Sequence, residues 1–319
     1  MDLDILVKGE KLRKYFDVGS KSKLHAVDDV DIEIPRGTTL GVVGESGCGK
    51  STLARVTLGL IPKTSGTLYF DGKDISHLSR KEQAEYRRQM QIIFQDPYSS
   101  LDPRMSVFEL ISEPLDVNKV FKHKDEKQDY VMGLMKQVGL AERFVNAYPH
   151  EMDGGRRQRV CVARALALNP KFIVCDEPVS ALDVSIQAQI LNLLMDLQDE
   201  RGLTYMFITH DMSVVKHISN EIMVMYLGQC VERASSSELF KNPLHPYTKA
   251  LLSAVPKPVI NRMSNEEILR GEVSNPIDPP DGCRFAPRCK FCTQKCLEKN
   301  PEFTDQGGRH FVACTLFEK

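Results

Sequence analysis

The sequence reads Gly44-Glu45-Ser46-Gly47-Cys48-Gly49-Lys50-Ser51 between a strand-like run at 38–43 and a helix-like segment that begins at Lys50. A glycine, four residues and then Gly-Lys-Ser, in this context, predict a phosphate-binding loop. Backbone N–H groups and a helix N-terminus would hold the phosphates, Lys50 would reach the β- and γ-phosphates, and Ser51 would bind magnesium. The alternative is a glycine-rich turn. The predicted nucleotide site at this loop is Gly44, Glu45, Ser46, Gly47, Cys48, Gly49, Lys50, Ser51 and Thr52.

Two acids, Asp176 and Glu177, follow the apolar run 172–175. The end of a strand is where a carboxylate can meet magnesium and an attacking water. We assign Asp176 to the metal and Glu177 to the base that orients or deprotonates the water. Because strands also end in acids at solvated loops, this assignment depends on the phosphate loop upstream.

The chain alternates between strand-rich and helix-rich parts. A strand, a helix and a strand joined by short links after residue 170 predict a βαβ unit, hence an α/β fold with a parallel sheet covered by helices. The helix-rich insert covers about 96–165, and a boundary is expected near Val255. The expected strands are 30–34, 38–43, 67–70, 171–175 and 204–209, and the expected helices are 50–60, 105–115, 125–139, 155–168 and 185–198.

Composition and charge exclude several classes of protein. The 319 residues are 42% hydrophobic and 27% charged, with a net charge of −1, which is the balance of a globular chain and gives no overall basic field for nucleic acid. No run reaches the ~18 apolar residues of a membrane span. The acidic start Met1-Asp2-Leu3-Asp4 does not resemble a secretory signal, so a cytoplasmic location is expected.

In residues 5–255 these motifs resemble ATP-binding-cassette (ABC) ATPases. The resemblance implies a RecA-like core with an antiparallel β subdomain and a helical subdomain. Gln95 in Ile93-Phe94-Gln95-Asp96 is similar to the glutamine that senses magnesium, Ser180-Ala181-Leu182-Asp183 to the D-loop, and His210 to the histidine at the γ-phosphate. Phe16, with Tyr15 as the alternative, is similar to the aromatic residue that stacks on adenine.

The signature segment departs from the family pattern Leu-Ser-Gly-Gly-Gln, because the chain has Met152-Asp153-Gly154-Gly155-Arg156. In the family this segment binds the γ-phosphate of ATP held by the opposite subunit. Two unit charges about 4 Å apart repel by roughly 4 kcal/mol at an effective dielectric near 20, so Asp153 would weaken that contact unless Arg156 or a cation compensates. Alternatively, Asp153 simply caps its helix. A head-to-tail heterodimer with one degenerate site is the resulting hypothesis.

Two further stretches, 94–104 and 242–248, resemble the second ATPase (F) subunit of oligopeptide and dipeptide importers. That resemblance implies a second ATPase subunit, two transmembrane permeases, an extracellular peptide-binding protein and a place at the cytoplasmic face of the membrane, with no nucleic acid partner. Alternatives are import of nickel or an oligosaccharide, a non-transport ABC ATPase, and a cluster-bearing regulatory or interaction protein with residual nucleotide binding.

The tail holds five of the nine cysteines. Its resemblance to the importers' C-terminal extension, expected at 256–319, implies a [4Fe–4S] cluster on four thiolates. Cys292 leaves the ligand set open, since Cys289 and Cys292 form a Cys-x-x-Cys pair that could bind zinc or replace one cluster ligand. Free thiols packed in a small core are the third possibility. The expected cluster ligands are Cys283, Cys289, Cys296 and Cys314.

Overall fold

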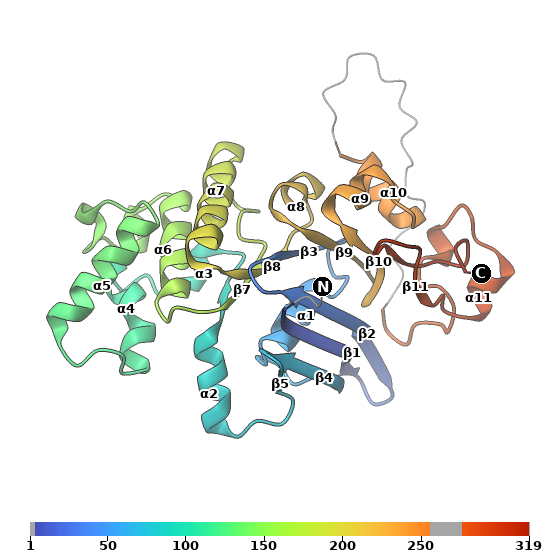
Figure 1. Cartoon of the computed structure of the whole chain (residues 1–319), viewed down its shortest axis with the longest axis horizontal. Coiled ribbons are helices and arrows are strands. Elements are labelled where there is room, and N and C mark those ends of the chain that lie inside the picture. The colour runs from blue at the N-terminus through green and yellow to red at the C-terminus, as the bar shows by residue number, and fades with distance from the viewer. Residues whose placement is uncertain (1–3, 256–275, 319) are drawn as a thin grey trace, which may run out of the picture. The chain divides into compact units, whose positions relative to one another are not determined.

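The computed structural model describes residues 4–255 and 276–318. The chain forms two compact units (Figure 1). Of the described residues, unit 1 combines 4–77 with 207–255 and 276–318, and unit 2 is the continuous segment 78–206. The boundary predicted near Val255 adjoins residues outside the described ranges, so the predicted domain limits stay a prediction.

An antiparallel sheet in unit 1 is built on a long hairpin of β1 (Ile5–Val18) and β2 (Ser22–Pro35). β4 (Ser65–Phe70) pairs with the other edge of β1, and β5 (Lys73–Asp74) pairs with β4 (Figure 1). Register shifts interrupt the β1–β2 ladder, and Lys11 has a φ of 47°. This sheet is the antiparallel subdomain that the sequence predicted.

A second sheet in unit 1 carries the phosphate loop. β3 (Thr39–Val43) is wholly buried and runs parallel to β9 (Glu221–Tyr226), which pairs with the antiparallel β10 (Gln229–Ser235). Gly41 is required here, because a Cβ would lie 2.1 Å from Val215 of α8 (Met212–Ile218). The other helices are α1 (Lys50–Thr57), α9 (Ser236–Lys241) and α10 (Pro246–Ser253).

The tail joins this second sheet. β12 (Phe311–Ala313) pairs with β10, and β11 (Phe303–Asp305) pairs with β12. Between β10 and these strands lie a 3-10 turn, η3 (Ala286–Arg288), and the short α11 (Gln294–Glu298). Phe285 packs into the same hydrophobic core as residues of β9 and α10, so the described tail is part of unit 1.

Unit 2 contains the parallel pair β6 (Met90–Ile93) and β7 (Phe172–Asp176) together with most of the helices. Ser79 begins α2 (Arg80–Gln89) and Ser106 begins α4 (Val107–Val117), each with a capping box that satisfies N–H groups at the start of the helix. β8 (Thr204–Ile208) leads from unit 2 to unit 1. The helices are α2 (Arg80–Gln89), α3 (Pro97–Ser100), α4 (Val107–Val117), α5 (Lys124–Gln137), α6 (Gly154–Leu166) and α7 (Val184–Arg201), with 3-10 turns at Glu142–Phe144 and Pro149–Glu151.

The predicted α/β class and the parallel strands are confirmed. Within residues 4–255 and 276–318, no helix is long and apolar enough to cross a bilayer.

Candidate functional site

The phosphate loop of unit 1 connects β3 to α1 through three glycines with positive φ. Gly44, Gly47 and Gly49 have φ of 152°, 78° and 104°. A Cβ on Gly49 would lie 2.0 Å from the backbone oxygen of Ala26, so only glycine fits there. Gly49 is also the N-cap of α1, and in the described structure no side chain caps this helix. The helix start is therefore available to a phosphate.

Lys50 closes the loop. Its Nζ donates to the backbone oxygens of Gly44 at 2.8 Å and Glu45 at 3.0 Å, and the residue is 5% exposed. The ammonium is thus held inside the curve of the loop, where a β- or γ-phosphate oxygen would meet it. Burial raises the pKa of the neighbouring Cys48 thiol, so this cysteine stays protonated.

Two residues that the sequence did not indicate also contact this loop. The Glu45 N–H donates to the hydroxyl of Tyr247 in α10, and the Glu45 carboxylate accepts from Arg288 of the tail. Tyr247 lies in the stretch that indicated the importer family, but neither residue has a local signal for this contact.

The acid pair and the predicted glutamine lie together in unit 2. Asp176 ends β7 and is buried, and Glu177 follows with a φ of 48°. The Gln95 Nε2 donates to the Glu177 Oε2 at 2.9 Å, although the two residues are 82 positions apart. Gln95 and Glu177 thus form a polar pair at the residue that follows β7. The assigned roles of Gln95 and Asp176 at magnesium and of Glu177 at water stay predictions.

His210 follows β8 and is exposed in unit 1. The next residue, Asp211, caps α8 by accepting from the Ser213 N–H at 2.7 Å. The Thr209 N–H donates to Val42 of β3, which places the start of this loop beside the strand that carries the phosphate loop. Lys50 and Ser51 therefore share unit 1 with His210, whereas Gln95, Asp176 and Glu177 belong to unit 2.

The segment predicted from the sequence to be an altered signature leads into α6. Asp153 is the N-cap, and its carboxylate accepts from the Arg156 N–H at 2.8 Å. The Arg156 guanidinium forms an ion pair with the same carboxylate at 2.9 Å and lies over the ring of Phe144. The capping interpretation therefore describes this residue locally, and Arg156 supplies a compensating charge.

The two signature glycines make room for the segment that contains the predicted D-loop. A Cβ on Gly155 would lie 2.7 Å from Ile186, and one on Gly154 would lie 3.0 Å from Leu182. The side chain of Gln187 donates to the backbone oxygens of Val179 and Leu182, which fixes the D-loop segment. The signature and the D-loop segment thus pack against each other within unit 2.

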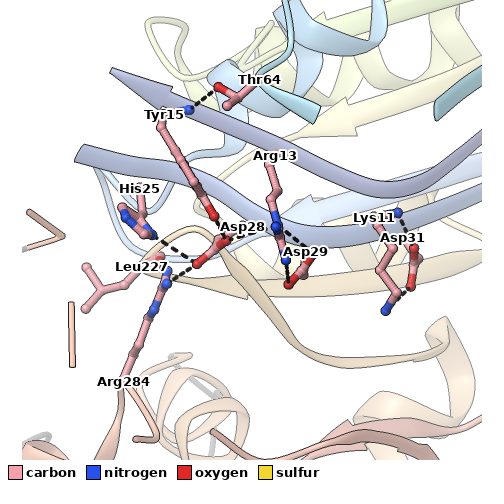
Figure 2. Close-up of polar contacts among 10 residues, drawn as sticks. All are labelled: Lys11, Arg13, Tyr15, His25, Asp28, Asp29, Asp31, Thr64, Leu227 and Arg284. Atoms are coloured by element: carbon pink, nitrogen blue, oxygen red, sulfur yellow. Dashed lines mark hydrogen bonds and ion pairs between the residues drawn. The ribbon is translucent and has the colours of Figure 1, made fainter. Parts of the chain in front are cut away.

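Of the two candidate adenine partners, Tyr15 is already engaged (Figure 2). Its hydroxyl donates to Asp28, and its ring stacks on His25 with centroids 4.0 Å apart. Burial and the bond to Asp28 raise the pKa of Tyr15 to about 12. Phe16 is 38% exposed, with the Lys14 ammonium 4.7 Å from its ring centre. The geometry favours Phe16 as the ring available to adenine.

Arg284 of the tail completes this cluster. Figure 2 shows its guanidinium between Asp28 and the backbone oxygen of Leu227, with a hydrogen bond to each. Asp28 also accepts from Tyr15 and lies 3.1 Å from the His25 ring nitrogen. Burial opposes ionisation of Asp28, but these partners together lower its pKa. The tail is therefore tied to β2 by a buried charged contact.

The four predicted cluster ligands of the tail line one cavity of about 10 Å³, which Cys292 does not line. Among the described residues, however, no group of three or more histidine, cysteine, aspartate or glutamate side chains is placed to hold a metal ion. A cavity this small takes about one water molecule, whereas a [4Fe–4S] core has eight atoms. The cluster prediction thus gains no support from the arrangement of these thiols.

Comparisons with known proteins agree with this fold and these motifs. Residues 27–180 match the family model of ABC transporters, and residues 231–296 match the model of the oligopeptide/dipeptide transporter C-terminal region. The oligopeptide transport ATP-binding protein OppF of Salmonella typhimurium is 47% identical over 97% of this chain and 96% of its own length. The chain belongs to the ATP-binding proteins of the oligopeptide/dipeptide ABC transporter family. Its family is one of ATP-hydrolysing transporter subunits.

A second relative and a solved structure agree with this family assignment. The dipeptide transport ATP-binding protein DppF of Haemophilus influenzae is 47% identical over 95% of this chain and 94% of its own length. Among solved structures, the dimeric ATP-binding cassette MJ0796 bound to ADP and phosphate matches with a TM-score of 0.66 and 30% identity, over 72% of this chain and 99% of that one. The ABC cassette fold predicted from the sequence is confirmed.

Proposed function

We propose that this chain hydrolyses ATP to energise the import of di- and oligopeptides at the cytoplasmic face of a membrane. In this proposal it works with two transmembrane permeases and a second ATPase subunit, and an extracellular binding protein delivers the peptide. The observation that carries the proposal is the phosphate loop closed by Lys50, in a chain whose nearly full-length relatives are named peptide transport ATP-binding proteins.

The residues have distinct roles in the proposed hydrolysis. The loop amides and Lys50 bind the β- and γ-phosphates, and Phe16 stacks on adenine. Glu177, held by Gln95, orients and deprotonates the attacking water, and His210 contacts the γ-phosphate. Ser51, Gln95 and Asp176 are oxygen ligands of the kind magnesium prefers, and the ion would offset charge on the phosphates.

Asp153 supports an unequal pair of ATP sites in a heterodimer. Where the family has serine, this chain presents a carboxylate to the nucleotide of the partner subunit. The ion pair with Arg156 offsets that charge, so the repulsion is weaker than for a bare carboxylate. We infer that ATP on the partner faces a weakened signature, whereas ATP on this chain faces the partner's own signature.

A metal site in the tail is proposed separately. It rests on the match of the chain to the oligopeptide/dipeptide transporter C-terminal region, and its candidate ligands are the four thiols that line one cavity, Cys283, Cys289, Cys296 and Cys314, whereas Cys292 is exposed. The thiols would have to move apart to enclose a [4Fe–4S] cluster, while a single zinc ion needs less space. Anaerobic purification followed by iron, sulfide and zinc analysis tests this: about four irons and four sulfides per chain support the cluster. One zinc without iron refutes the cluster, and no metal refutes the site.

The ATPase function is tested with Glu177→Gln in the assembled transporter. We expect ATP turnover to fall by about 100-fold or more, because the base is lost, while nucleotide binding persists. Glu200→Gln, at an exposed position of α7 outside the predicted site, is the matched control and should hydrolyse ATP like the wild type. Equal turnover by Glu177→Gln and the wild type would refute the assignment of the base.

A further inference from the structure

Arg288 of the tail reaches back to the phosphate loop across 243 positions of sequence. Its Nη1 donates to the Glu45 Oε2 at 2.7 Å and its Nη2 donates to the Oε1 at 3.0 Å. The arginine side chain is 6% exposed, and the glutamate side chain is 24% exposed. A two-point, charge-assisted contact of this kind fixes both the position and the orientation of the carboxylate.

The backbone of Glu45 is held from the same side. Its N–H donates to the hydroxyl of Tyr247 at 2.8 Å, and Tyr247 is fully buried. The Tyr247 ring packs against Tyr226 and Phe285 at centroid distances of 4.8 and 5.5 Å. Phe285 lies in the tail, three residues before Arg288. The second residue of the phosphate loop is thus anchored by side chain and by backbone to a rigid aromatic cluster.

This anchor matters for nucleotide binding because Glu45 carries a negative charge. Glu45 directly follows Gly44, and its backbone oxygen accepts from the Lys50 ammonium, so the residue lies within the loop that would cradle a triphosphate. A carboxylate that is neither paired nor held away would repel that anion. The Arg288 guanidinium neutralises the carboxylate and holds it on the tail side of the loop.

The turn that carries Arg288 is tied to the cysteine cavity. The Ala286 N–H donates to the Cys283 oxygen at 2.9 Å, and the Cys289 N–H donates to the Ala286 oxygen at 3.2 Å. Both cysteines line the cavity, and Arg288 immediately precedes Cys289. The position of the guanidinium therefore depends on how the tail is folded.

We propose that Arg288 is a positioning residue of the nucleotide site: by neutralising and holding Glu45, the C-terminal tail keeps the phosphate loop competent to bind ATP. This inference rests on the proposed function, because it requires that the loop binds nucleotide. In this proposal the tail contributes directly to the affinity of the phosphate loop for ATP.

The test measures the affinity of the full-length chain for a fluorescent ATP analogue with magnesium. We expect Arg288→Ala to bind about tenfold more weakly, because Glu45 is left unpaired beside the phosphates. Adding Glu45→Gln to Arg288→Ala should restore most of the affinity, since it removes the unpaired charge. Arg309→Ala is the matched control, because this tail arginine pairs with Glu33 and should bind like the wild type.

Rescue by Glu45→Gln separates positioning from folding of the tail. A double variant no tighter than Arg288→Ala, or an Arg288→Ala variant that binds like the wild type, overturns the inference. Should Arg288→Ala not fold, Arg288→Lys retains the charge with one contact instead of two and should bind about threefold more weakly, and unchanged affinity overturns the inference. A wild-type chain that binds no nucleotide refutes the proposed function instead.

Discussion

At the scale of single residues, Asp153 combines a structural and an electrostatic role. The carboxylate caps α6 through the Arg156 N–H and pairs with the Arg156 guanidinium. Serine also caps helices well. Asp153→Ser should therefore change the free energy of unfolding by only about 0.3 kcal/mol. Any effect of this substitution on catalysis can therefore be separated from folding.

We expect Asp153→Ser to raise ATP turnover of the assembled pair of ATPase subunits by about threefold, because in the proposed heterodimer it removes a negative charge beside the partner's nucleotide. Steady-state phosphate release by the purified complex measures this. Arg156→Gln should have the opposite effect, since it removes the charge that compensates Asp153. An unchanged rate for Asp153→Ser in a well-assembled complex contradicts the proposed asymmetry.

The buried side chain of His245 makes the stability of the fold depend on pH. Burial lowers the pKa of this side chain to about 4, although the nearby Glu232 carboxylate favours the charged form and Lys249 opposes it. The pKa of His245 in the folded chain lies below its ordinary value of 6.5, so the stabilisation is complete above pH 6.5 and is lost as the pH falls toward 4. The neutral ring accepts from the Tyr247 N–H and caps α10.

The wild type should lose about 2 kcal/mol of unfolding free energy through His245 between pH 7.5 and 5. Asparagine can cap the helix without titrating. Over the same pH range the His245→Asn variant should therefore lose about 2 kcal/mol less unfolding free energy than the wild type. Denaturant unfolding of both proteins is measured at both pH values. Because the other titrating groups are the same in the two proteins, their contribution cancels in the difference. Equal pH dependence of the two proteins contradicts the assignment.

At the scale of elements, the connection between β3 and α1 depends on where each glycine lies. Gly49 has a φ of 104°, and a Cβ there would meet the backbone oxygen of Ala26 at 2.0 Å. Gly47 has a φ of 78°, but a Cβ there would meet no described atom within 4 Å. Both positions have a positive φ, which strains any residue that replaces glycine. Only at Gly49 would a side chain also collide with another segment.

We expect Gly47→Ala to lower the free energy of unfolding by about 1 kcal/mol, the cost of a left-handed alanine. Gly49→Ala should cost about 3 kcal/mol, because the backbone of β2 or of the loop must also shift. Denaturant titration of the two variants measures the difference. Equal destabilisation would show that the contact with Ala26 is easily relieved.

The elements that the sequence predicted are those with a clear apolar pattern. The expected helix 185–198 corresponds to α7 (Val184–Arg201), and the expected strand 38–43 corresponds to β3 (Thr39–Val43). In contrast, α2 was not predicted, since none of its residues is buried and it has no apolar stripe. The tail strands β11 and β12 have three residues each, too few for an alternating pattern to be detected.

The residues of the site differ in the same way. The phosphate loop and the acid pair were predictable because each is a continuous motif at the end of a strand. Contacts between distant segments had no such signal: Arg288 meets Glu45 243 positions away, and Arg284 meets Asp28 256 positions away. Only the folded chain brings the tail to the residues of β2 and to the loop after β3.

At the scale of the whole molecule, the predicted catalytic residues are divided between the units. The phosphate loop and His210 belong to unit 1, and the acid pair, Gln95 and the signature belong to unit 2. A chain with one phosphate loop and one signature supplies half of each of two ATP sites in the proposed heterodimer. The proposed function therefore requires a second ATPase subunit and membrane partners.

The most direct test is ATP-driven uptake of a labelled peptide by proteoliposomes that contain the complete transporter and its binding protein. With the wild-type chain, the peptide should accumulate inside only when ATP is present on the side of the ATPase subunits. With Glu177→Gln, accumulation should cease although the complex remains assembled. Undiminished accumulation with Glu177→Gln, or ATP-driven uptake of nickel or an oligosaccharide but of no peptide, would contradict the account.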